Sequence, residues 1–184
     1  RGAHREAITG RGLTVEWPEG SVTLRIPVVG SPAELTFGDD DVVLVAVKSQ
    51  DTAGVVEALG AVAPVTTPIV CLQNGVTNEI AFLRRFRNVH GVTVMAPTWH
   101  LEPGVVRAYT HHAAAILDIG RWPDGVDDVT EAVAAAFRAS GFESVPRPDI
   151  RRWKYAKLLL NLTNPIDALC ARDDPDFDRL AALS

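Results

Sequence analysis

The chain has 184 residues, of which 47% are hydrophobic, and a mean hydropathy of +0.08, a composition typical of a globular protein with one large domain or one domain and part of another. A net charge of −5 argues against a nucleic-acid surface, and no run is long enough to span a membrane. Cys71 and Cys170 are too few for a disulfide framework or a zinc site, so we expect a reducing, cytoplasmic setting and no bound metal.

The beginning of the chain is predicted to form a helix followed by a hairpin. Residues 3–9 have helical spacing and are followed by glycines, which are typical helix stops. The segments 13–17 and 22–28 flank Pro-Glu-Gly at residues 18–20, a sequence typical of a turn between two strands.

The following part of the chain alternates apolar strands with helices. Residues 41–47 (DVVLVAV) are almost continuously apolar, which is typical of a strand covered on both faces in a parallel sheet. The pattern continues with a helix over 52–63, a strand over 68–72, a helix over 78–86 and a strand over 89–95. This order predicts an open, doubly wound α/β sheet.

The last part of the chain has a different pattern. Residues 105–109 and 113–119 are predicted to pair as antiparallel strands joined through His111-His112, and a helix over 128–139 and a short strand over 142–145 follow. Pro146 and Pro148 then interrupt the chain ahead of a helix that begins near Ile150. We therefore expect one domain over residues 1–148 and the start of a helical domain over 149–184.

Two predicted strands end in polar turns. VKSQDT follows the strand over 41–47, and LQNGV, with Asn74-Gly75 as the turn, follows the strand over 68–72. Ligands of open α/β sheets bind at the carboxyl ends of the strands, where both turns lie. Lys48 would meet a phosphate there, and Asp51 or Thr52 would cap the next helix. The alternative is a pair of capped turns without a ligand.

The predicted last helix carries an unusual polar row. Lys157, Asn161 and Asn164 share one helix face, Lys154 lies one turn before them, and leucines cover most of the remaining surface. This arrangement favours a buried helix whose polar row faces a wet pocket, because buried ammonium and amide groups need partners. The alternative is a solvated lysine on a helix that ends at Pro165.

Three segments together resemble the ketopantoate reductase (2-dehydropantoate 2-reductase) family. They are DVVLVAVKSQDT, IVCLQNGV and WKYAKLLLNLTNP, in the family's order and approximate spacing, and the resemblance extends from Arg1 to about Cys170. It implies reduction of a small 2-oxoacid, 2-dehydropantoate, to pantoate with NADPH, in pantothenate and coenzyme A biosynthesis.

The resemblance also implies roles for individual residues. Lys157 matches the catalytic lysine and Asn161 a substrate-binding asparagine. Asn164 resembles a second substrate asparagine, although it follows Asn161 by three residues where many members have four. The positions that match cofactor-binding residues are Arg1, Lys48, Asn74 and Ala96.

The chemistry of ketone reduction fits these residue types independently of the resemblance. Hydride delivery to a ketone carbon leaves a developing alkoxide, and an ammonium beside that oxygen stabilises the charge and donates the proton. Asparagine amides bind a carboxylate or a hydroxyl without adding charge. A nicotinamide cofactor carries out the hydride step itself.

The chain departs from the family pattern at both ends. The G-x-G-x-x-G fingerprint, which precedes the position of Arg1 in the family, is absent, and the family continues with further helices after the position of Ser184. The resemblance therefore implies an internal segment, with an incomplete Rossmann-like doubly wound sheet and the start of an all-helical domain. We expect a sheet without its central strand to expose apolar surface, and this chain alone to bind NADPH weakly or not at all.

Two other functions remain open at this point. A β-hydroxyacid dehydrogenase also uses a lysine and an asparagine one turn apart, although the QNGV turn and the early hairpin argue against it. A truncated, non-catalytic homologue would act as a binding or dimerisation module. A homodimer is compatible with either enzyme.

Overall fold

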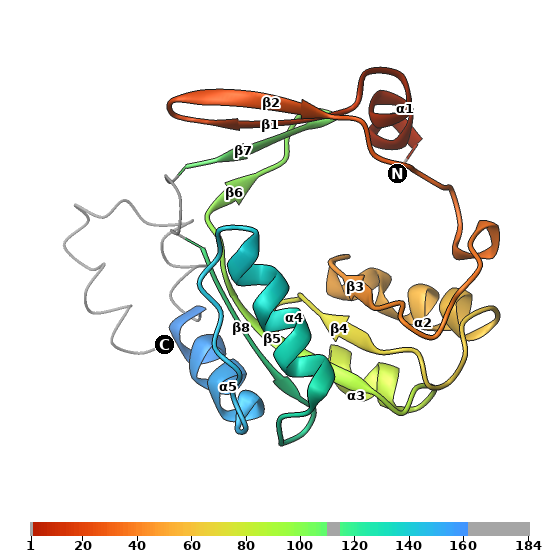
Figure 1. Cartoon of the computed structure of the whole chain (residues 1–184), viewed down its shortest axis with the longest axis vertical. Helices are drawn as coiled ribbons and strands as arrows, with labels where there is room; N and C mark the ends of the chain where they lie inside the picture. Colours follow the sequence, from red (N-terminus) through yellow and green to blue (C-terminus); the bar gives the residue numbers. More distant parts are fainter. Residues whose placement is uncertain (1, 110–114, 162–184) are drawn as a thin grey trace, which may run out of the picture.

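The computed structural model describes residues 2–109 and 115–161, which form two sheets and five α-helices (Figure 1). In chain order the elements are α1 (Gly2–Arg11), β1 (Leu13–Trp17), β2 (Gly20–Leu24), the 3-10 turn η1 (Pro32–Glu34), β3 (Val43–Val45), the 3-10 turn η2 (Ser49–Asp51), α2 (Thr52–Gly60), β4 (Ile69–Cys71), α3 (Asn78–Leu83), β5 (Val89–Met95), β6 (Thr98–Trp99), β7 (Val105–Ala108), β8 (Ile116–Arg121), α4 (Asp128–Ala139) and α5 (Ile150–Leu160). No helix within these described ranges is long and apolar enough to cross a membrane.

The first sheet has the strand order β2-β1-β7-β6 and contains the predicted hairpin. β1 and β2 pair antiparallel, with Leu13 opposite Leu24 and Trp17 opposite Gly20. β7 runs parallel to β1 on its other side, and β6 is antiparallel to β7. The helix α1 leads directly into this sheet, as the sequence predicted, and both lie together at one end of the molecule (Figure 1).

The second sheet has the strand order β3-β4-β5-β8 and confirms the predicted alternation of strands and helices. β3, β4 and β5 are parallel, and α2 and α3 form the two crossovers between them. Parallel neighbours need such crossovers, since a tight turn can join only antiparallel strands. β8 closes one side of this sheet by pairing antiparallel with β5, from His90–Arg121 to Met95–Ile116.

The predicted pairing of residues 105–109 with 113–119 is wrong. β7 belongs to the first sheet and β8 to the second, so the two strands do not pair with each other. β8 instead places the buried side chains of Leu117 and Ile119 under α4, in an apolar cluster with Val92 of β5. This burial explains why β8 lies against β5, because a hairpin with β7 would leave these side chains without a core.

Side chains of the second sheet alternate between two apolar clusters, one on each face. Ile69 and Cys71 of β4 point into the cluster formed with α2, α3 and the start of α5, whereas Val70 points into the cluster under α4. All three residues are completely buried. β4 is therefore covered on both faces, as its continuous apolar sequence predicted.

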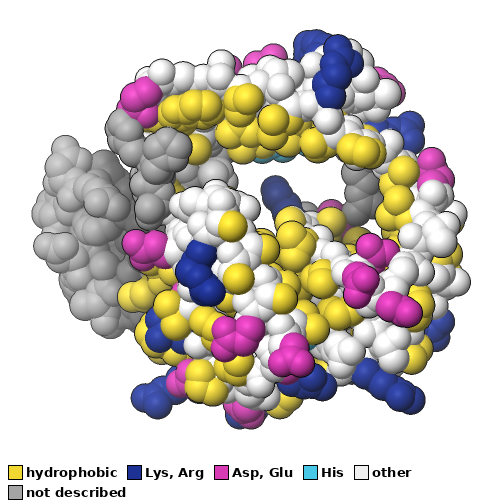
Figure 2. Space-filling view, in the orientation of Figure 1, with side chains coloured by type: hydrophobic (Ala, Val, Ile, Leu, Met, Phe, Trp, Pro, Cys, Tyr) yellow, Lys and Arg dark blue, Asp and Glu magenta, His cyan; other side chains and the backbone are white. Residues whose placement is uncertain are grey.

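β3 differs from the prediction of a strand covered on both faces. Val45 is buried in the cluster of α2 and α3, but Leu44, which faces the other way, is 51% exposed. Among the described residues β3 is also an edge strand of its sheet. The space-filling view shows an opening between the part of the molecule built on the first sheet and the part built on the second, with hydrophobic side chains along its rim (Figure 2).

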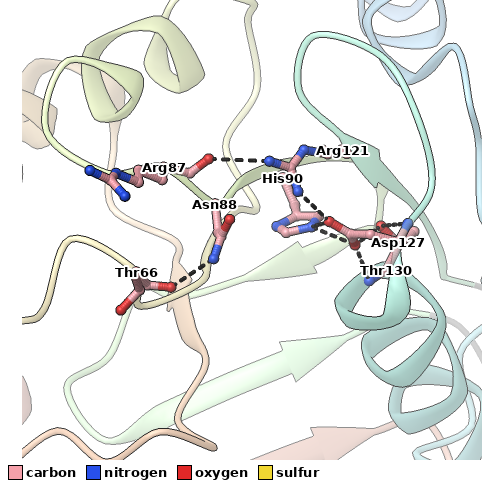
Figure 3. Close-up of polar contacts among 7 residues, drawn as sticks. All are labelled: Thr66, Arg87, Asn88, His90, Arg121, Asp127 and Thr130. Carbon is pink, nitrogen blue, oxygen red and sulfur yellow. Dashed lines mark hydrogen bonds and ion pairs between the residues drawn. The ribbon is translucent and has the colours of Figure 1, made fainter.

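A polar network holds the start of α4 beside the first residues of β5 (Figure 3). Asp127 is the N-cap of α4 and forms a capping box with Thr130. The same carboxylate accepts a hydrogen bond from Arg121 at 2.8 Å and lies 2.9 Å from Nε2 of His90, which is completely buried. These contacts tie α4 to β5 and β8, and so set how the helix lies on the sheet.

The segment between α4 and α5 runs alongside β8. It forms isolated parallel bridges, Glu143 with Ile116 and Pro146 with Ile119, where the sequence predicted a short strand. α5 then begins at Ile150, as predicted, and packs against β5 and β8. The division into domains over 1–148 and 149–184 stays a prediction.

Candidate active site

A small pocket lies where β4 and β5 end and α5 passes over them. We call it the Lys157 pocket; its walls are formed by Gln73, Asn74, Gly75, Val92, Thr93, Val94, Lys154, Lys157, Leu158 and Asn161. These residues come from the turn after β4, from β5 and from α5. Their position agrees with the expectation that ligands of such sheets bind at the carboxyl ends of the strands.

Lys157 reaches this pocket from the last turns of α5. Its ammonium donates a hydrogen bond to Oδ1 of Asn74, with 3.0 Å between the two heavy atoms. The side chain is half-buried, and the pKa of Lys157 is lowered, first by this burial and then by the positive charge of Lys154. A lysine with a lowered pKa releases its proton more readily than a solvated one, which suits a proton donor.

Asn161 lies on the wall of the same pocket, one turn after Lys157. It is the C-cap residue of α5, in helical conformation, and its side chain is half-buried. The polar row that the sequence predicted is therefore present as far as Asn161. Asn164, the next residue of that row, lies outside the described residues.

The leucines around the polar row are not all covered, which corrects the expectation of a buried helix. Leu158 packs against the core beneath α5, whereas Leu159 and Leu160 are 67% and 69% exposed. The helix thus presents its polar row to the sheet and part of its apolar surface outward.

Lys154 is more deeply buried than Lys157. Its ammonium lies 2.6 Å from Oε1 of Glu79 and donates hydrogen bonds to the backbone carbonyls of Gln73 and Val92. The sequence placed Lys154 on the polar row but did not identify its partner, and Glu79 was not singled out. The available signal was a carboxylate at the second position of the helix after the QNGV turn, followed by the apolar run IAFL.

The QNGV turn is held in place by a second polar network. Asn78 is buried and donates hydrogen bonds to the carbonyl of Asn74 at 3.0 Å and to Oγ of Ser49 at 3.1 Å. Its amide oxygen accepts a hydrogen bond from Thr52, which in turn accepts one from Gln73. These bonds join the two polar turns that the sequence predicted at the sheet edge.

The predicted cap of α2 is not formed in the expected way. Asp51 occupies the N-cap position but makes no side-chain capping hydrogen bond, and the hydroxyl of Thr52 is used by the network with Asn78 instead. Thr52 therefore connects the turns after β3 and β4, a long-range role that spacing along the chain does not reveal.

The remaining predicted cofactor residues lie apart from the Lys157 pocket. Lys48 is exposed and is the N-cap of η2, directly before Ser49. Ala96 is half-buried and follows the end of β5. The structure thus brings Lys157, Asn161 and Asn74 together and leaves these two positions on the adjoining turns. Arg1 lies outside the described residues.

Two buried oxygens beside this pocket have no hydrogen-bond partner within the described part of the chain. They are Oε1 of Gln73 and Oγ1 of Thr93, and both residues contribute to the pocket wall. Buried polar atoms are normally paired. A carboxamide such as that of nicotinamide carries the N–H donors that these oxygens lack.

Comparison with known proteins identifies the family. The sequence model of the family described as ketopantoate reductase PanE/ApbA matches residues 1–124. The 2-dehydropantoate 2-reductase of Halobacterium salinarum is 32% identical over 178 residues, which are 94% of this chain and 55% of that protein. The chain spans about half the length of the curated relatives it matches.

Solved structures share the fold. The 2-dehydropantoate 2-reductase from Geobacter metallireducens is 28% identical with a TM-score of 0.76, over 86% of this chain and 52% of that chain. A ternary structure of D-mandelate dehydrogenase with NADH and anilino(oxo)acetate is 19% identical with a TM-score of 0.76, over 89% of this chain and 52% of that chain. At that identity the second likeness concerns the fold alone.

Proposed function

Because the chain belongs to the ketopantoate reductase family, we propose that the protein reduces 2-dehydropantoate to (R)-pantoate, or a related 2-oxoacid to its hydroxyacid, with NADPH. The observation that carries the proposal is the contact of the Lys157 ammonium with Asn74, at the carboxyl ends of β4 and β5. An amine held by a neutral amide, beside a pocket, is placed to meet the oxygen of a ketone.

Lys157 acts as the general acid in this proposal. Its ammonium lies next to the ketone oxygen, stabilises the negative charge that develops there, and donates its proton from Nζ. The lowered pKa of Lys157, caused by burial and by Lys154, makes this donation easier. Asn74 keeps the ammonium oriented and adds no charge that would hold the proton back.

Asn161 binds the polar groups of the substrate. Its half-buried amide borders the same pocket as Lys157 and offers both a donor and an acceptor to a carboxylate or hydroxyl. We propose the same role for Asn164, three residues further along the sequence.

A bound nicotinamide cofactor supplies the hydride. Asn74, on the same pocket wall as Gln73 and Thr93, would hold the nicotinamide end, and the resemblance adds a backbone contact from Ala96. Lys48 and Arg1 would meet the adenosine phosphate, and their positive charge is the basis for proposing NADPH in place of NADH.

The setting of this activity is also a proposal. A ketopantoate reductase would serve pantothenate and coenzyme A biosynthesis, in the cytoplasm. Residues from 149 onward, beginning with α5, would form the start of a helical domain that completes the substrate site and supports a possible homodimer.

The test is turnover of 2-dehydropantoate with NADPH by the product of the whole gene. Lys157→Ala should lower kcat by at least about 100-fold, the typical contribution of a general acid. Arg152→Ala, an exposed change on the same helix, is the matched control and should retain activity. If Lys157→Ala retains full activity, the role of Lys157 as general acid fails, whereas a wild-type gene product without any turnover would favour a binding module. Faster turnover of 3-hydroxyisobutyrate would favour a β-hydroxyacid dehydrogenase instead.

A further inference from the structure

A buried ion pair lies directly behind the Lys157 pocket. It joins Lys154 of α5 to Glu79 of α3, whose side chains are 3% and 0% exposed, with 2.6 Å between Nζ and Oε1. Burying such a pair carries a desolvation penalty that its attraction often fails to offset, so its presence is weak evidence for a role in stability. This raises the question of what else the pair does.

Lys154 holds the backbone at the point where β4 and β5 separate. Its ammonium donates to the carbonyl of Gln73 at 2.8 Å and to that of Val92 at 3.2 Å. With Glu79, the three N–H groups of the ammonium have three oxygen neighbours. One side chain thus fixes the distance of α5 from the turn after β4 and from the middle of β5.

The surrounding residues leave just enough room for this pair. A Cβ atom added to Gly91 would lie 3.2 Å from Cδ of Lys154 and 3.3 Å from Oε1 of Glu79. The same atom would lie 3.2 Å from the ring of Trp122, which is buried. A side chain at position 91 would therefore press directly on the pair.

The contact of Lys154 with Gln73 affects Asn74, the next residue of the turn, which orients the Lys157 ammonium. Gln73 immediately precedes Asn74, which accepts the hydrogen bond from Lys157. Lys154 and Lys157 lie one turn apart on α5. The buried lysine therefore joins the helix that carries the proposed acid to the turn that carries its acceptor.

We propose that Lys154, held by Glu79, is a positioning residue that sets the Asn74 turn and the Lys157 ammonium at the separation needed for proton donation. This inference rests on the proposed function for its kinetic consequence, but the geometry that it concerns exists without substrate. It assigns no contact with substrate to Lys154 or Glu79.

The ion pair also affects the pKa of Lys157. The charged group that acts on Lys157 is Lys154, which is itself paired with Glu79 on α3 and interacts with Cys71 on β4, whose thiol burial keeps neutral by raising its pKa. Lys154 lowers the pKa of Lys157. Removing the pair should therefore raise the pKa of Lys157 and disturb its position together.

The main variant is Lys154→Met/Glu79→Gln, which replaces both charges with neutral side chains of similar size. In the product of the whole gene we expect kcat to fall about 100-fold, the loss typical of a misplaced catalytic group. We expect the KM for NADPH to change less than kcat. The alkaline limb of the pH–rate profile should move to higher pH, because Lys157 must be protonated to act.

Thr130→Val is the matched control, because it alters a buried polar network on the other face of the sheet. It should leave kcat and the alkaline limb unchanged. If the double variant does not fold, Gly91→Ala takes its place and should lower kcat by pressing on the same pair. An unchanged kcat and an unchanged alkaline limb in the folded variant would overturn the proposal.

A titration separates this inference from the proposed function. The lysines of the product of the whole gene are ¹³C-methylated, and the signal of Lys157 is assigned with Lys157→Arg and followed by NMR against pH. The midpoint should rise in Lys154→Met/Glu79→Gln and stay in place in Thr130→Val. Should the gene product reduce no 2-oxoacid, this midpoint still decides the role of Lys154, and an unmoved midpoint refutes it.

Discussion

The ammonium of Lys157 lies 3.0 Å from the amide oxygen of Asn74, although 83 residues separate them in the sequence. Lys157 belongs to α5, which packs on the sheet, and Asn74 belongs to the turn after β4. The contact is between a cation and a neutral acceptor, so it orients the ammonium without adding a counter-charge.

Asn74→Asp tests this relationship with a side chain of nearly the same shape. A carboxylate next to Lys157 favours the charged ammonium, so the pKa of Lys157 should rise from its lowered value. A weaker acid donates its proton less readily, so kcat should fall while the alkaline limb of the pH–rate profile moves upward. The two effects are measured together in the product of the whole gene. A limb that moves downward would contradict the contact.

Asn78→Leu should destabilise the fold through the network that joins the two polar turns. The substitution leaves the buried hydroxyl of Thr52, Oγ of Ser49 and the carbonyl of Asn74 without the amide that they contact. An unsatisfied buried partner costs about 1–3 kcal/mol, and we expect a loss of about 2–3 kcal/mol in urea unfolding. Asn88→Leu, which removes a single bond to the carbonyl of Thr66, is the control and should lose about 1 kcal/mol.

The free energy of unfolding should decrease as the pH falls below neutral, because of His90 and Asp127. Burial lowers the pKa of His90 in the folded protein below its ordinary value of 6.5. As the pH falls through 6.5, the unfolded chain therefore binds a proton at His90 before the folded protein does, which favours unfolding. For Asp127, burial acts to raise the pKa, but hydrogen bonds from Thr130, His90 and Arg121 outweigh it and hold the pKa well below 3.8. Its stabilisation is present above pH 4 and is lost in stronger acid.

Chemical denaturation at a series of pH values measures this dependence. His90→Gln keeps a donor near Asp127 and removes the titration, so its unfolding free energy should change less than that of the wild type between pH 7 and pH 5. Equal slopes for the two proteins would show that His90 is not the group responsible.

The two faces of β3 should respond differently to the same substitution. Leu44 is 51% exposed, so Leu44→Lys should change the free energy of unfolding by no more than about 0.5 kcal/mol. A lysine on an edge strand also discourages pairing between molecules, so light scattering should show less self-association. Val45→Lys places an unpaired charge in the core and should abolish folding. Similar stability of the two variants would contradict the assignment of the faces.

Local patterns were enough to predict most of the elements and part of the site. The apolar run over 68–72 predicted a strand covered on both faces, and Ile69 to Cys71 are completely buried. The spacing of Lys157 and Asn161 predicted one shared helix face, because the helical repeat brings residues four apart together. The resemblance of QNGV and the lysine helix to one family supplied the expected chemistry, and the family is confirmed.

Tertiary structure decided what those patterns touch. The spacing of residues along α5 does not show that Lys154 contacts Glu79 and the carbonyl of Gln73. Gln73 is 81 residues away in the sequence and lies in the turn after β4, so only the packing of α5 on the sheet brings the two together. Periodicity also predicted the strands β7 and β8 but not their partners, because partners are chosen by which sheet edge is open and which side chains can be buried there. The sequence by itself determined which residues share a face, since that depends only on the backbone repeat; the packing of distant elements determined which faces meet.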